Sequence, residues 1–188
     1  MLFSKKGQNY RMVKELACDF AKKNQNDAVK KREEAGAVRP EVYLCIGSDK
    51  LVFDCLGPIV GSLLKRDARF NGYVYGTVEE PVTALQVEEA IRFIRRFHFG
   101  AEVTVVDSAV GRREEVGKIK TFNSGLHPAL GVDKNMPVIG DKSIMGVITT
   151  KEKVKDLRSC NVKLKEVYEM AKSVVEMICR ENRQNKGA

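Results

Sequence analysis

The chain has 188 residues, enough for one globular domain with a sizeable core, because domains commonly hold about 100 to 200 residues. Hydrophobic residues make up 43% and charged residues 31%, and no apolar run approaches the ~18 residues that a membrane-spanning helix needs. The first residues lack the apolar stretch of a secretory signal. We therefore expect a cytoplasmic protein without a membrane partner.

The net charge of +8 is concentrated at the two ends of the chain. Residues 1–40 carry a net charge of +5 and residues 151–188 one of +4, whereas the segment between them is close to neutral. Acids are interspersed in both basic segments, and aromatic residues are only 7% of the chain. Solvated helix faces explain such charges better than nucleic-acid binding does, so we do not expect a nucleic-acid partner.

Helical and extended patterns alternate along the chain. Apolar residues at three- and four-residue spacing predict helices, and short runs of β-branched and aromatic residues predict buried strands. We predict helices over 10–21, 57–67, 84–97 and 164–178, and strands over 41–47, 73–78, 101–109, 115–123 and 143–150. This alternation predicts an α/β fold with a mostly parallel central sheet and helices on both of its faces.

The pattern indicates a single α/β domain over residues 1–188. Its parts are a basic helical extension over 1–40, a core over 41–150, and a carboxyl-terminal helix with a frayed tail over 151–188. A stretch rich in Gly, Pro, Asn and Asp over 123–141 predicts an ordered loop within the core.

The five cysteines are scattered, odd in number and without a CxxC pair. This usage predicts reduced thiols rather than a disulfide framework or a zinc knuckle. Cys45 lies inside the first predicted strand, so we expect it to be a small buried hydrophobe. The five are Cys18, Cys45, Cys55, Cys160 and Cys179.

Two acids follow predicted strands of the core. Asp54 comes between the strand over 41–47 and the next helix, and Asp107 ends the apolar run "VTVV". Ligand sites of parallel sheets form beyond the carboxyl ends of the strands, so we expect both side chains there, joined by His127 from the following loop. Two close carboxylates cannot both ionise cheaply and can serve as acid and base, whereas two carboxylates with a histidine suit a divalent metal ion. Both arrangements predict hydrolysis.

Each of these three residues also has a structural explanation. Asp54 could cap the helix that follows it, Asp107 could form part of a turn, and His127 could bond a loop carbonyl. The residues alone leave both interpretations open. No phosphate-binding glycine motif follows a predicted strand, and no Gly-x-Ser-x-Gly motif surrounds Ser108, which disfavours nucleotide binding and a serine hydrolase.

Four stretches of the core together resemble the YyaC family of sporulation proteins. They follow the order and spacing of that family's motifs and span about residues 41–150. The stretches are "YLCIGSDKLVFDCLGPIVGSLL", "VYGTVEEPVTALQVEE", "VVDSAVGRREEVGKIK" and "SGLHPALGVDKNMPVIGDKSIMGVI". The YyaC family is similar in turn to the germination protease of spore-forming bacteria and, more remotely, to the peptidases that mature nickel hydrogenases.

The resemblance implies a three-layer α/β/α sandwich of the phosphorylase/hydrolase-like type. In the germination protease, two aspartates after strands are thought to act as an acid pair on small acid-soluble spore proteins, and the matching residues here are Asp54 and Asp107. The hydrogenase peptidases use a carboxylate at each of these places and a histidine to hold nickel, which by position implies His127 as a third ligand of one divalent metal ion. The implied function is a sporulation-associated peptidase, aspartic-type or metal-assisted, that cleaves a spore protein.

One turn departs from the family pattern. Relatives carry a small, hydroxyl-rich turn before the acid, whereas this chain has Leu51, Val52 and Phe53 before Asp54. We expect these apolar side chains to narrow or dry the cleft, which would raise a carboxylate pKa or close the site to a substrate chain. The alternative function is therefore a non-catalytic sporulation protein that binds a peptide or protein in the same cleft.

Overall fold

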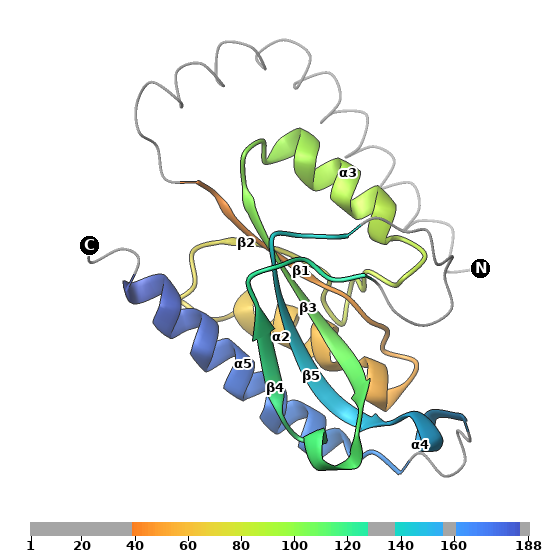
Figure 1. Cartoon of the computed structure of the whole chain (residues 1–188). Coiled ribbons are helices and arrows are strands. Elements are labelled where there is room, and N and C mark those ends of the chain that lie inside the picture. The colour runs from red at the N-terminus through yellow and green to blue at the C-terminus, as the bar shows by residue number, and fades with distance from the viewer. Residues whose placement is uncertain (1–38, 128–137, 156–160, 185–188) are drawn as a thin grey trace, which may run out of the picture. The chain divides into compact units, whose positions relative to one another are not determined.

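The computed structural model describes residues 39–127, 138–155 and 161–184 (Figure 1). The chain divides into two compact units, Met1–Arg39 and Pro40–Ala188, and the fold described here is that of the second. Several predictions lie outside the described residues: the helix over 10–21, the thiols of Cys18 and Cys160, and much of the loop over 123–141.

A five-stranded sheet forms the centre of the fold, in the order β2-β1-β3-β5-β4. The strands are β1 (Glu41–Cys45), β2 (Tyr73–Tyr75), β3 (Glu102–Gly111), β4 (Ile119–Phe122) and β5 (Lys142–Thr150). β2, β1, β3 and β5 run parallel, whereas β4 pairs antiparallel with β5. The predicted mostly parallel sheet is therefore confirmed.

Helices cover both faces of the sheet and complete the predicted three-layer α/β/α sandwich (Figure 1). They are α2 (Leu56–Leu64), α3 (Val87–Phe97), α4 (Lys151–Lys155) and α5 (Leu164–Gln184), with short 3-10 turns η1 (Val52–Asp54) and η2 (Arg113–Glu115). α2 and α5 pack together on one face, and α3 packs on the other. None of the helices that the structure describes combines the length and apolar character needed to cross a membrane.

The apolar run of β1 contributes to both layers of the core, because successive strand residues point to opposite faces. Val42 and Leu44 join a cluster with α3, whereas Tyr43 and Cys45 join a larger cluster with α2 and α5. A strand that is buried on both faces needs apolar side chains throughout, which explains why "EVYLC" shows little alternation. The cysteines of the described residues, Cys45, Cys55 and Cys179, are free thiols. Cys45 is buried as predicted, and the other two are buried as well.

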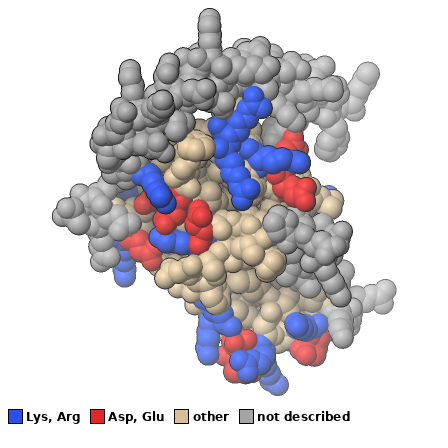
Figure 2. All heavy atoms as spheres, turned by 45° about the horizontal axis from the view of Figure 1, so that its top comes forward, with Lys and Arg blue, Asp and Glu red and all other residues tan. Residues whose placement is uncertain are grey.

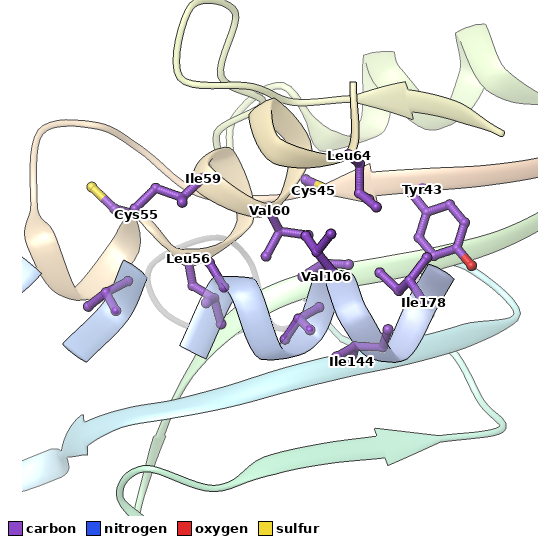
Figure 3. Close-up of a cluster of buried hydrophobic side chains, with 14 of the residues drawn as sticks. Tyr43, Cys45, Cys55, Leu56, Ile59, Val60, Leu64, Val106, Ile144 and Ile178 are labelled. Carbon is purple, nitrogen blue, oxygen red and sulfur yellow. The ribbon is translucent and has the colours of Figure 1, made fainter. Parts of the chain in front are cut away.

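The larger cluster depends on the apolar stripe of α5 (Figure 3). Val167, Ala171, Val174 and Ile178 have 0% exposure and recur at three- and four-residue spacing, so they share one face of the helix. This face packs over α2, where Leu56 is also fully buried. Each of the buried Val, Leu and Ile side chains contributes roughly 1.5 to 3 kcal/mol by leaving water.

Two predicted boundaries are wrong. β3 does not end at residue 109 but continues to Gly111, because it stays paired with β5 after β1 has ended. α5 does not fray from residue 180 but continues to Gln184, and Asn182 in its last turn is only 5% exposed.

Charged side chains of both signs are interspersed on the described surface. In Figure 2, Lys and Arg side chains lie next to Asp and Glu side chains at several places on the face shown. Arg69 is one such cation in the structure, since its guanidinium group pairs with Asp67 and with Glu176, each at 2.6 Å. Surface pairs of this kind contribute about 0 to 1 kcal/mol each, so apolar packing rather than charge holds the layers together.

Candidate functional site

Asp107 lies where β1 ends and β3 continues. The last pair of the β1–β3 ladder joins Cys45 to Val106, and the Ile46 N–H donates to the Val106 carbonyl at 2.8 Å. Asp107 is the next residue of β3, so it pairs with Met145 of β5 on one side and lies beyond the end of β1 on the other. Asp107 therefore lies at the carboxyl edge of the sheet, where it was expected, although the strand itself is longer than predicted.

A closed loop between β1 and α2 positions Asp54. The Gly47 N–H donates to the Val82 carbonyl at 3.0 Å, and the Ser48 N–H donates to the Asp54 carbonyl at 3.1 Å. The Cys55 thiol donates to the Ser48 carbonyl at 3.2 Å. Gly47 has a φ of 145°, and a Cβ atom there would collide with the Asp54 carbonyl, so this position requires glycine. These contacts fix the backbone from which the Asp54 side chain projects.

The structural explanations considered for the two acids are wrong. Asp54 ends η1, and α2 begins after it with Cys55 in the N-cap position and no side-chain cap hydrogen bond, so Asp54 is not the N-cap residue. Asp107 lies inside β3 rather than in a turn. Neither partly buried carboxyl group is thus accounted for by capping or turn formation.

Burial and the charge of Asp54 both act on the protonation of Asp107. The pKa of Asp107 is raised to about 8, chiefly by burial and also by the negative charge of Asp54, although the Ser108 N–H donates to its Oδ1 atom at 2.7 Å and opposes this shift. Burial also raises the pKa of Asp54, and the backbone N–H of Ser48 partly offsets that rise. Asp107 therefore keeps its proton at neutral pH, and Asp54 is the member of the pair that ionises first.

His127 is exposed and follows the buried residue Leu126. Leu126 exchanges backbone hydrogen bonds of 3.0 and 2.9 Å with Ile139, which fixes the backbone next to the histidine. In the part of the chain that the structure describes, no three His, Cys, Asp or Glu side chains are placed so that they could hold a metal ion. Within the described residues, the two acids are therefore linked electrostatically, but they do not form a metal-binding group with His127.

The three apolar residues before Asp54 differ in their burial. Leu51 and Val52 are exposed, at 42% and 37%, whereas Phe53 packs against the larger core cluster. Two apolar side chains therefore face solvent close in sequence to the Asp54 carboxyl group.

Sequence patterns did not reveal two residues that build this edge of the sheet. Val82 forms an isolated parallel bridge with Ile46, so a second segment of chain borders the end of β1. Thr77 is 3% exposed and forms the preceding turn, in which its N–H donates to the Glu80 carbonyl and its Oγ1 accepts from the Glu80 N–H, both at 3.0 Å. The stretch "GTVEEP" could have indicated this turn, because Gly, Thr and Pro around polar residues are typical of turns.

The protein is thus of the α/β class: a three-layer α/β/α sandwich with two aspartates, Asp54 and Asp107, at the carboxyl edge of its sheet. The family described as "Protein of unknown function (DUF1256)" matches residues 15–177, and the chain belongs to that family. It is 34% identical over 145 residues to the "Uncharacterized protein YyaC" of Bacillus subtilis (strain 168), which covers 77% of this chain and 70% of that protein. The resemblance to the YyaC family is therefore confirmed.

A solved structure was also matched by fold. It is the crystal structure of a [NiFe] hydrogenase maturation protease HycI from Thermococcus kodakarensis KOD1, with a TM-score of 0.44 and 15% sequence identity. The match covers 76% of this chain and 91% of that protein.

Proposed function

We propose that the chain is a hydrolase that cleaves a peptide bond with Asp54 and Asp107 as its acid and base. The observation that carries this proposal is the protonation of the pair. Asp107 has a pKa of about 8, raised first by burial and then by the charge of Asp54, so one carboxyl group holds a proton while its neighbour can ionise.

The two roles follow from that difference. Ionised Asp54 accepts a proton from a water molecule whose oxygen attacks the peptide carbonyl carbon, and protonated Asp107 donates its proton to the leaving amide nitrogen. The C–N bond breaks as the C–O bond forms, and the pair ends the cycle with its one proton on the other carboxyl group. General acid and base catalysis of this kind typically contributes about 10² to 10⁴ in rate.

The substrate and setting are part of the proposal. The relation to the germination protease, which the sequence motifs imply, supports a small acid-soluble spore protein as substrate and the sporulating cell as the place of action. His127 is proposed to orient that substrate beside the acids, in line with the position implied for it by the motif "SGLHPALG".

The test is mass spectrometry of small acid-soluble spore proteins incubated with the purified full chain. We expect defined cleavage products with the wild type and a loss of at least about 100-fold in rate with Asp54→Asn or Asp107→Asn. Glu88→Gln, which removes an exposed charge of α3, is the matched control and should keep the activity. Cleavage that survives both aspartate substitutions would overturn the proposal.

Removal of metal separates the two hydrolytic mechanisms. An acid pair needs no metal ion, so we expect cleavage to continue at an unchanged rate in a chelator such as EDTA. Loss of activity in the chelator and its return with a divalent ion would instead support the metal site with His127.

A second candidate function is peptide binding without turnover. The exposed apolar side chains of Leu51 and Val52 beside Asp54 favour it, because they offer a contact surface next to the carboxyl pair. The same incubation distinguishes the two, since a binding protein would retain intact spore proteins on a column. If the protein only binds, Leu51→Ser should weaken the retention of spore proteins on the column. If the protein is a peptidase, the same substitution should leave the positions of cleavage unchanged.

A further inference from the structure

A polar cavity lies at the opposite edge of the sheet from the carboxyl pair. Its volume is about 290 Å³, and it lies where β1, β3 and β5 begin and where the last turn of α5 passes over them. The inference drawn from it is independent of the proposed hydrolase, because Asp54 and Asp107 are at the carboxyl edge.

Three buried polar side chains line this cavity. Tyr43 and Asn182 are each 5% exposed and Thr104 is 7% exposed. Within the described residues, the side chains of all three lack a hydrogen-bond partner. Figure 3 shows the Tyr43 oxygen directed away from the apolar side chains around its ring. The enclosed polar atoms without a partner in the described residues are Ser108 Oγ and Thr149 Oγ1, so the polar atoms of these three side chains are instead open to the cavity, where a polar occupant can reach them.

The charged residues that line the cavity give it a net negative charge. Lys142 pairs with Glu102 at 2.9 Å, which neutralises one carboxylate. Glu41 and Glu181 have no ion-pair partner among the described residues and border the same cavity. The charges of these three glutamates also raise the pKa of Tyr43, after burial as the main cause, so the phenol stays protonated.

We propose that this cavity binds a small organic cation that carries a primary amine or a guanidinium group. Such a cation brings several N–H donors and a positive charge, which match two unpaired carboxylates and the oxygens of a phenol, an amide and a hydroxyl group. The volume equals that of about ten water molecules, enough for such a group on a short alkyl chain. A metal ion, in contrast, needs its oxygens to converge within about 2.6 Å of one point, whereas these acceptors are spread over two strands and a helix.

The probes for this proposal are n-butylguanidinium and n-butylammonium chloride, with neutral n-butanol for comparison. Isothermal titration calorimetry of the full chain should show saturable binding of at least one cation and none of the alcohol. Glu181→Gln should weaken binding roughly tenfold, because it removes a charged acceptor. Tyr43→Phe keeps the ring and removes only the oxygen, and it should weaken binding as well.

Glu166→Gln is the matched control, since it neutralises an exposed glutamate near the other end of α5. Its affinity for the cations should equal that of the wild type. The proposal is overturned if neither cation binds saturably, if the alcohol binds equally well, or if Glu166→Gln and Glu181→Gln weaken binding equally. Saturable binding of Ca²⁺ or Mg²⁺ that depends on Glu181 would also overturn it, in favour of a metal site.

Discussion

At the residue scale, the burial of Asp107 gives the stability of the fold a defined dependence on pH. The folded-state pKa of about 8 lies above the value of about 3.9 expected in the unfolded chain. The folded protein thus keeps a proton that the unfolded chain releases, and the resulting stabilisation is complete below pH 4 and is lost as the pH rises to about 8.

Asp107→Asn removes this titration while keeping the shape of the side chain. Relative to the variant, the wild type should lose unfolding free energy by roughly 1.4 kcal/mol per pH unit between about pH 5 and pH 7.5. Urea unfolding of both proteins across this range measures the difference. A constant difference between them would show that Asp107 ionises with an ordinary pKa.

The same pair predicts a bell-shaped dependence of activity on pH. The acidic limb appears where the base, Asp54, becomes protonated, and the alkaline limb appears near pH 8, where the acid, Asp107, loses its proton. Rates of peptide cleavage between pH 4 and pH 10 test this expectation. An activity that rises steadily through pH 9 would rule out Asp107 as the general acid.

At the element scale, the loop between β1 and α2 depends on a glycine with no room for a side chain. A Cβ atom on Gly47 would collide with the Asp54 carbonyl, whereas a Cβ atom on Gly100, which also has a positive φ, would have nothing within 4 Å. We expect Gly47→Ala to cost about 3 kcal/mol or more of unfolding free energy and Gly100→Ala about 1 kcal/mol. Thermal unfolding of the two variants provides the comparison, and equal losses would mean that the loop can relax.

At the scale of the whole molecule, α5 covers one face of the sheet and closes the larger core cluster. Ile178 is fully buried there, while Leu164 of the same helix is 56% exposed. Ile178→Ala should therefore destabilise the protein by about 2 to 5 kcal/mol and Leu164→Ala by less than about 1 kcal/mol. Chemical denaturation measures both, and a small effect at Ile178 would show that α5 is not part of the cooperative core.

Much of this architecture could be predicted from the sequence because it rests on local patterns. The run "EVYLC" predicts a strand buried on both faces, and the stripe that includes Ile178 predicts a helix on a core. The end of β3 could not be predicted, since its continuation from residue 109 to Gly111 depends on pairing with β5, far along the chain. Sequence patterns likewise placed both acids at one edge but could not reveal the loop contacts of Val82, which are made only after folding.

The most direct measurement is a carbon-13 NMR titration of the aspartate carboxyl groups in the wild type and in Asp54→Asn. The carboxyl pair predicts that Asp107 titrates near pH 8 and that its pKa falls when the charge of Asp54 is removed. A pKa of Asp107 near 4, or one that does not respond to Asp54→Asn, would contradict the pairing from which both the hydrolytic mechanism and its pH dependence were derived.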